Sequence, residues 1–208
     1  MLLNQDFKMQ STDTNIEITQ AFIKKTTLHD FVSLSQSGEI STNIETLRTS
    51  DFKYMSKLPL TAMLSTSRRN KVASLVVKDG HILSTGFNRP PDNFHPACDF
   101  ERVLSDEEME KYQIKGKDRF TTHLYTIHAE AIALFDADND DTLNSHVYVS
   151  LSPCLECCKL IIQKGVKRVV FGEMYRFPSH LWYLVQAGIE IVYIKQNYMD
   201  KRTLDVIN

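Results

Sequence analysis

The sequence predicts an α/β domain in which helices cover a β-sheet. Two observations carry this prediction: a strong hairpin signal early in the domain, and a regular alternation of helical and strand patterns in the second half of the chain. Such alternation favours a layered sheet, because each helix can cross over the sheet between two strands. The 208 residues, 42% of them hydrophobic, can build such a core without disulfide bonds.

The domain is predicted to begin with a helix and a hairpin. Apolar residues recur at three- and four-residue spacing over residues 51–69, which predicts an amphipathic helix that Pro59 interrupts or kinks. Asp79-Gly80 separates two β-rich runs, at 72–77 and 81–87, and this dipeptide is typical of a two-residue hairpin turn. We therefore expect the two runs to pair as antiparallel strands.

The rest of the domain alternates between helical and strand periods. The predicted helices cover residues 126–137, 155–164 and 178–187, and the predicted strands cover 147–151, 166–171 and 189–194. Gly165 and Gly188 follow the last two helices, where glycine commonly ends a helix.

The connecting and terminal segments have their own patterns. The acidic cluster at 136–141 is predicted to be a solvated loop. The connection at 89–123 is expected to border the functional site, because loops this long in a compact domain are usually functional or partly disordered. Residues 1–50 are rich in polar residues and keep no apolar period, which predicts an N-terminal extension, either a weak docked helix or partly ordered. The domain itself is expected over 51–195, followed by a tail at 196–208.

Charge and hydropathy exclude two classes of protein. The 24 Lys and Arg residues against 26 Asp and Glu give a net charge of −2, which excludes the broad basic field of a duplex-binding protein. The chain contains no apolar run of the ~20 residues that a membrane span requires. Residues 1–10 lack the basic start and apolar block of a secretory signal. We therefore expect a cytoplasmic protein that makes no membrane contact.

Two short motifs carry the predicted chemistry. His128-Ala129-Glu130 is followed, after 22 residues, by Pro153-Cys154-Leu155-Glu156-Cys157. This H-x-E and P-C-x-x-C arrangement is the known signature of zinc nucleobase deaminases. One imidazole and two thiolates leave a tetrahedral Zn²⁺ with an open fourth position, which is the pattern of a catalytic site. His128, Cys154 and Cys157 are therefore the predicted ligands of one catalytic zinc ion.

Glu130 is the predicted catalytic residue. It lies close enough to the ligands to reach a zinc-bound water, whose pKa the ion can lower towards about 7. In the predicted mechanism Glu130 takes a proton from this water, delivers it to the ring nitrogen beside the attacked carbon, and later protonates the departing amine. Cys158 follows a ligand directly but is predicted to be a buried small hydrophobic residue.

At these residues the sequence resembles the cytidine and deoxycytidylate deaminase superfamily, over roughly residues 51–195. Within it, Ser67-Arg68-Arg69-Asn70-Lys71-Val72, Ser84-Thr85-Gly86-Phe87-Asn88 and Val149-Ser150-Leu151-Ser152-Pro153-Cys154 look most like dCMP deaminases of phage and eukaryotic type. The resemblance implies a three-layer α/β/α fold with a five-stranded mixed sheet, a bound zinc ion, and conversion of dCMP and water to dUMP and ammonia.

The resemblance also implies a set of substrate-binding residues. Asn88 is expected to contact the sugar, and Tyr175 to line the base or sugar pocket; a turn residue and a core aromatic are the respective alternatives. Ala129 and Ser152 are expected to bind substrate beside the two motifs. Because arginine suits bidentate phosphate contacts, the candidates for the 5′-phosphate are Arg68, Lys71, Arg89 and Arg176.

Further expectations concern a second metal and the partners. His95, Cys98 and His123 could supply ligands for a structural zinc, but Arg68 and Arg69 stand where further cysteines would be expected, so one ion is the favoured prediction. The resemblance implies a homo-oligomer, with dCTP and dTTP as effectors.

Other functions stay open at this point. The substrate could be dCTP or a modified dCMP. A deaminase of tRNA adenosine or single-stranded cytosine would need a basic and aromatic track, and the acidic segment at 92–118 argues against one. The basic cluster of Lys159, Lys164, Lys167 and Arg168 is predicted to be a solvated helix face and turn. A non-catalytic nucleotide-sensing relative would have no use for Glu130 beside an open metal position.

Overall fold

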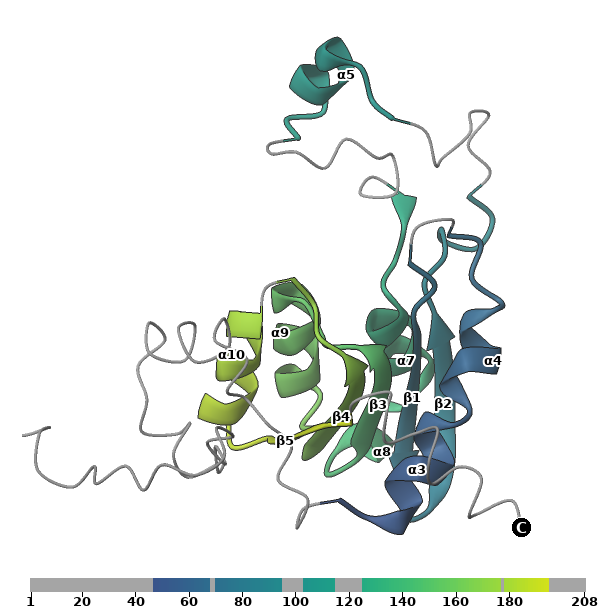
Figure 1. Cartoon of the computed structure of the whole chain (residues 1–208), viewed down its shortest axis with the longest axis vertical. Coiled ribbons are helices and arrows are strands. Elements are labelled where there is room, and N and C mark those ends of the chain that lie inside the picture. The colour runs from purple at the N-terminus through teal and green to yellow at the C-terminus, as the bar shows by residue number, and fades with distance from the viewer. Residues whose placement is uncertain (1–46, 68–69, 95–102, 115–124, 177, 195–208) are drawn as a thin grey trace, which may run out of the picture.

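The computed structural model describes residues 47–67, 70–94, 103–114, 125–176 and 178–194. Within these ranges five strands form one sheet with helices on both faces (Figure 1), so the predicted three-layer α/β/α fold is confirmed. Arg68, His95, Cys98 and His123 lie outside the described residues, as do residues 1–46 and 195–208. No described helix has both the length and the apolar character needed to cross a membrane.

The sheet is mixed, with the strand order β2-β1-β3-β4-β5. Strands β1 (Ala73–Lys78) and β2 (His81–Phe87) form the predicted hairpin, and β3 (His146–Leu151) pairs with β1 in the antiparallel direction. Strands β4 (Arg168–Glu173) and β5 (Glu190–Tyr193) continue the sheet in parallel. Asp79 and Gly80 close the hairpin with φ angles of 49° and 81°, as a type I′ turn requires.

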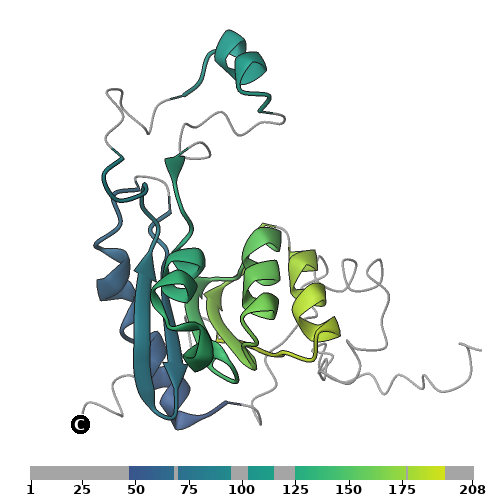
Figure 2. The same cartoon turned by 180° about the vertical axis from the view of Figure 1, so that it is seen from behind.

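Two apolar cores lie on the opposite faces of this sheet, because successive strand residues point to opposite sides. Leu75, Tyr148 and Val170 pack with α3 (Thr49–Met55) and α4 (Leu58–Ala62). Val76 and Val149 pack on the other face, which α7 (Ala129–Asp136), α9 (Leu155–Gln163) and α10 (Leu181–Gln186) cover (Figure 2). The helices that carry the two motifs therefore share one face of the sheet.

Several element boundaries differ from the predictions, and at three of them the structure shows the reason. The first predicted helix is two helices, α3 and α4, and Pro59 lies in the first turn of α4, where its missing N–H has no intrahelical partner. Helix α7 begins at Ala129, later than predicted, because His128 is its extended N-cap. Strand β4 begins at Arg168, because the N–H of Val166 bonds to Ile161 in the turn that closes α9.

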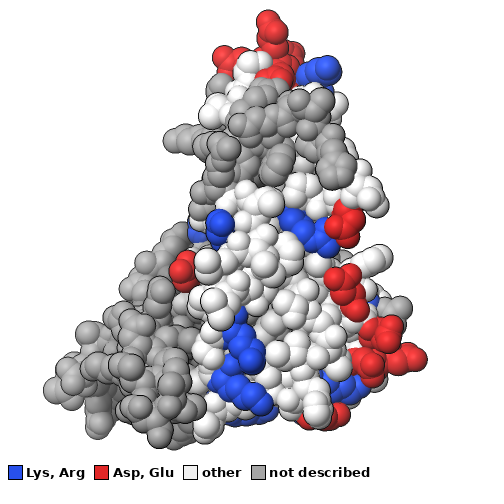
Figure 3. All heavy atoms as spheres, turned by 90° about the vertical axis from the view of Figure 1, so that its right-hand side faces the viewer, with Lys and Arg blue, Asp and Glu red and all other residues white. Residues whose placement is uncertain are grey.

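Two segments predicted to lack regular structure contain helices. The acidic cluster includes the short α8 (Asn139–Thr142), and the long connection includes α5 (Asp106–Lys111). Ser105 and Glu108 form a capping box at the start of α5, a pattern that the sequence carries as S-x-x-E. Helix α5 lies apart from the three layers (Figure 1), and its acidic side chains gather at the tip of the molecule (Figure 3).

Candidate active site

The two motifs meet because α7 and α9 begin near each other on one face of the sheet. His128 is the N-cap of α7 and Cys154 is the N-cap of α9, while Cys157 lies in the first turn of α9. The chain enters α9 only three residues after β3 ends at Leu151. These caps leave backbone N–H groups of both first turns directed towards the same region, which favours thiolates there.

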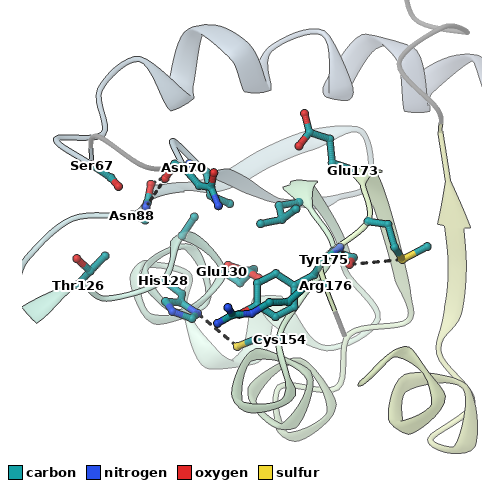
Figure 4. A pocket seen from close by; sticks show the side chains of 15 residues that line it. Ser67, Asn70, Asn88, Thr126, His128, Glu130, Cys154, Glu173, Tyr175 and Arg176 are labelled. Carbon is teal, nitrogen blue, oxygen red and sulfur yellow. Dashed lines mark hydrogen bonds between the residues drawn. The ribbon is translucent and has the colours of Figure 1, made fainter. Parts of the chain in front are cut away.

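The three side chains of the motifs form one cluster. His128 Nδ1 lies 3.3 Å from Cys154 Sγ and 3.5 Å from Cys157 Sγ (Figure 4). Two ligands of a tetrahedral zinc ion, at bond lengths of about 2.0–2.1 Å for nitrogen and about 2.3 Å for sulfur, lie roughly 3.6 Å apart. The spacing therefore fits one shared ion. Within the described part of the chain, this is the one group of three or more His, Cys, Asp or Glu side chains that could hold a metal.

Hydrogen bonding within the cluster distributes its protons unequally. A hydrogen bond with Cys157 lowers the pKa of Cys154 to about 3, although burial opposes this shift. The same hydrogen bond, together with burial, raises the pKa of Cys157. The hydrogen bond with Cys154 raises the pKa of His128. Of the two thiols, that of Cys154 is therefore the more readily ionised.

Glu130 is a buried carboxyl group beside this cluster. It is the second residue of α7, its side chain is only 4% exposed, and it lines the same pocket as His128 and Cys154. Burial raises the pKa of Glu130, while the nearby charge of His128 opposes the increase. A carboxylate with a raised pKa is a stronger proton acceptor than a free one, which suits general acid–base catalysis.

The pocket has a volume of about 420 Å³, within the range of small-molecule sites. Segments far apart in the sequence form its wall: the loop before β1, the end of β2, the start of α7 and the residues after β3 and β4. Its lining residues are Ser67, Asn70, Val72, Asn88, Thr126, His128, Ala129, Glu130, Leu151, Ser152, Cys154, Glu173, Met174, Tyr175 and Arg176 (Figure 4). None of the described residues of the connection at 89–123 lines the pocket, whereas Asn88 and Thr126, on either side of the connection, do.

Asn88 lines the pocket and also holds its wall together. Its Oδ1 accepts hydrogen bonds from the Ser65 hydroxyl at 2.7 Å and the Val72 N–H at 2.8 Å. Its Nδ2 donates to the Asn70 carbonyl at 2.8 Å. The asparagine therefore holds the loop, as its alternative role as a turn residue predicts, while its contact with the sugar stays a prediction. Ser65, which is 3% exposed, was missed by the sequence analysis because nothing local indicates a partner 23 residues away.

Ser152 holds the segment that follows β4. Its Oγ accepts a hydrogen bond from the backbone N–H of Tyr175 at 2.8 Å, and the side chain is 3% exposed. Tyr175 and Arg176 both line the pocket, and the Arg176 guanidinium carbon lies 5.6 Å from the centre of the Tyr175 ring. Figure 4 shows this pair on the side of the pocket where Cys154 lies, whereas the Glu173 carboxylate points away from the cluster.

The basic residues predicted to bind phosphate separate into different environments. Arg176 lines the pocket, whereas Lys71 is exposed and Arg89 pairs with Asp92, both outside the pocket lining.

The predicted basic surface cluster is wrong in one member. Arg168 is fully buried and pairs with Asp51 and Glu190, while Lys159 and Lys167 are exposed as predicted. Cys158 is confirmed as a buried side chain, at 0% exposure.

Comparisons with known proteins agree with this geometry. Residues 48–173 match the family model described as the cytidine and deoxycytidylate deaminase zinc-binding region, and this range contains both motifs. The chain is 30% identical over 166 residues to the deoxycytidylate deaminase of Enterobacteria phage T4, a match that covers 66% of this chain and 86% of that protein. It is 33% identical over 115 residues to the deoxycytidylate deaminase of Mycobacterium phage D29, covering 54% and 85%.

A solved structure shows the same fold. The dCMP deaminase from the cyanophage S-TIM5, crystallised in complex with dCMP and dUMP, superimposes with a TM-score of 0.56 at 29% sequence identity. The match covers 71% of this chain and 99% of that protein. The five-stranded sheet and the helices that carry the two motifs thus belong to a fold that is known to bind a pyrimidine nucleotide in that relative.

Proposed function

The chain belongs to the cytidine and deoxycytidylate deaminase family, and on that premise we propose that it hydrolyses dCMP to dUMP and ammonia. One observation carries the proposal: the buried carboxyl group of Glu130 lines a pocket beside the cluster of His128, Cys154 and Cys157. A structural metal site has no need of a buried acid at its open side. The named dCMP deaminase relatives support this substrate.

His128, Cys154 and Cys157 would hold one zinc ion, since their spacing and chemistry fit a tetrahedral site with three protein ligands. When bound, zinc supplies a water molecule activated for attack near neutral pH. This chemistry suits the addition of water to the carbon that bears the amino group of cytosine.

Glu130 would carry the protons of the reaction. Burial raises its pKa, which makes the carboxylate a stronger proton acceptor, so it can take a proton from the attacking water and pass it on. We propose that the proton goes to the ring nitrogen beside the attacked carbon, and that Glu130 later protonates the departing amine. Water is consumed and ammonia released, so the step needs no other reactant.

The remaining pocket residues would hold the nucleotide. We propose that Arg176 binds the 5′-phosphate, because among the phosphate candidates that the structure describes it is the one that lines the pocket. Tyr175 would contact the base or sugar, Asn88 would contact the sugar, and Ala129 would contribute at the first turn of α7. Ser152 would act through Tyr175, whose backbone its hydroxyl holds.

A small nucleotide is favoured over a polynucleotide. On the face seen in Figure 3, the Lys and Arg side chains of the described residues form separate groups with uncharged surface between them. A single strand would need a continuous basic track. The homo-oligomer and the effectors dCTP and dTTP stay predictions, to be measured by light scattering and by assays with each nucleotide added.

The test is a substrate panel with the purified, zinc-loaded protein. Ammonia release and product mass are measured with dCMP, dCTP, CMP, deoxycytidine, a cytosine-containing single strand and tRNA. We expect conversion of dCMP alone. Glu130→Gln should retain its zinc and lose turnover by at least about 10²-fold. Conversion confined to a polymer would contradict the proposed substrate, and substantial turnover by the Glu130 variant would contradict the role of the carboxyl group.

A further inference from the structure

Strand β2 makes an unusually close approach to α7, the helix that carries His128 and Glu130. A Cβ atom placed on Gly86 would lie 2.1 Å from the carbonyl oxygen of Ala129 and 2.6 Å from the backbone nitrogen of Ala133. Ordinary contacts of a Cβ atom are 3.4–4 Å. These two backbone atoms are the acceptor and donor of one i to i+4 step in α7. The first turn of the helix therefore rests directly on the strand, and only glycine leaves room for it.

A second contact holds the same helix one turn further along. The Ser84 hydroxyl donates a hydrogen bond to the carbonyl of Ala133 at 2.5 Å, and the serine is 8% exposed. Ser84 and Gly86 lie two residues apart on β2, so they share one face of the strand. Their contacts on α7, at Ala129 and Ala133, lie four residues apart and therefore share one face of the helix. Together, the two contacts fix how closely α7 approaches the sheet and how it is rotated about its own axis.

The position of α7 determines whether the cluster can form. Its N-cap supplies His128 Nδ1, while α9 supplies both sulfur atoms, so the distances of 3.3 and 3.5 Å depend on how the two helices are placed. Metal–ligand distances in proteins lie within about 0.2 Å of their standard values. A Cβ atom on Gly86 would lie 2.1 Å from the Ala129 carbonyl oxygen, whereas an ordinary contact begins at 3.4 Å. Strand β2 and helix α7 would therefore have to move apart by more than 1 Å.

We propose that Gly86 and Ser84 are positioning residues of the active site. They act through α7, setting His128 against the two cysteines and Glu130 against the pocket, and they contact neither metal nor substrate. This inference rests on the proposed function, but it concerns metal binding that can be measured without any nucleotide.

The experiment compares Gly86→Ala and Ser84→Ala with Thr85→Ala. Thr85 lies between them on β2, is exposed and points to the other face of the strand, which makes it a matched control. Each metal-free protein is titrated with Zn²⁺ against a chelating dye, and its visible spectrum is recorded with Co²⁺ in place of zinc. We expect Gly86→Ala to bind zinc at least about tenfold more weakly, as changes behind metal ligands commonly do, with an altered Co²⁺ spectrum. Ser84→Ala should shift both readouts in the same direction by less.

Two further measurements separate positioning from general loss of stability. Val192→Ala, in the buried part of β5 on the opposite face of the sheet, should lower stability without changing zinc affinity or the Co²⁺ spectrum. In the Gly86 and Ser84 variants kcat should fall more than KM rises, since Glu130 moves with the helix. If Gly86→Ala does not fold, the zinc affinity and Co²⁺ spectrum of Ser84→Ala test the proposal. Zinc affinity and a Co²⁺ spectrum equal to those of Thr85→Ala, in the folded variants, would overturn the proposal, whichever nucleotide the enzyme accepts.

Discussion

The carboxylate of Asp51 and the guanidinium of Arg168 form a two-point ion pair in which both side chains are fully buried. Oδ1 lies 2.5 Å from one terminal nitrogen and Oδ2 lies 2.9 Å from the other. The Tyr148 hydroxyl donates a further hydrogen bond to Asp51 at 2.9 Å, and Glu190 lies 3.1 Å from Arg168 Nε. The pair joins α3 to the start of β4, at the end of the strand opposite to the pocket.

Replacing Asp51 with alanine should strongly destabilise the protein. The change leaves the Arg168 guanidinium buried with its main partner removed, which commonly costs about 3–5 kcal/mol. Urea unfolding measures the loss. The double variant Asp51→Leu with Arg168→Met should lose much less, because no charge remains buried. In both, kcat of the folded protein should be nearly unchanged, and a large fall in kcat would show that the pair acts on the active site.

His146 should make the stability depend on pH. Burial and the positive charges of Arg168 and Arg48 lower its pKa below 6.5, although Asp51 and Glu190 oppose the shift. The unfolded chain therefore binds the proton more readily, so this contribution is present above about pH 6.5 and is lost as the pH falls towards the lowered pKa. Free energies of unfolding measured from pH 7.5 to 5 should decline, and His146→Gln should decline less. Equal slopes for the two proteins would refute this role.

Replacing Ser152 with alanine should impair substrate binding more than metal binding. The change removes the acceptor that holds the Tyr175 N–H, so Tyr175 and Arg176 lose their fixed position on the pocket wall. We expect KM for dCMP to rise about fivefold, in line with the ~1 kcal/mol of one hydrogen bond, with zinc content unchanged. Ser150→Ala is the matched control, since its hydroxyl accepts from the Ala73 N–H instead. A similar KM for both variants would contradict the prediction.

Replacing Asn88 with aspartate should disturb the wall of the pocket. The carboxylate can still accept from Ser65 and Val72, but it faces the Asn70 carbonyl where the amide donates. Repulsion between these oxygens should lower the melting temperature and raise KM. Ser65→Ala introduces no repulsion. It removes one hydrogen bond of the Asn88 side chain, together with the one that the Ser65 hydroxyl donates to the Asn88 carbonyl and the one it accepts from the Ser67 N–H, and should produce a smaller change of the same sign. Calorimetry and steady-state kinetics check both, and an unaltered KM in Asn88→Asp would exclude the asparagine from substrate binding.

Substitutions of Cys154 and Cys158 should have different effects, because only Cys154 is a predicted zinc ligand. Cys154→Ser should lose zinc, activity and stability, because a bound ion stabilises the folded state that holds it. Cys158→Ala should keep its zinc and most of its activity, because its sulfur is buried in the core and does not belong to the group of ligand atoms. Metal analysis and thermal unfolding with and without a chelator test both variants. Loss of zinc from the Cys158 variant would reassign the ligands.

The sequence predicted most elements of the fold because their signals are local. The Asp79-Gly80 turn, the period-2 strands and the glycines after α9 and α10 each act within a few residues. The wrong predictions lie where a turn or a helix cap, and not the spacing of apolar residues, decides the local structure. Examples are the start of β4 and the helix α5, which begins with a capping box. The capping box is visible in the sequence as Ser105 and Glu108, three residues apart.

The sequence by itself determined the chemistry of the candidate site, because a metal cluster depends on residue types that two short motifs carry. The tertiary structure decided everything that depends on distant partners. The sequence predicts Arg168 to be a surface residue. In the fold it is buried against Asp51, which lies 117 residues away in the sequence. The close packing of Gly86 against α7 likewise exists only once strand and helix meet. Local patterns specify which groups are present, but the packing of the folded chain determines which of them come into contact.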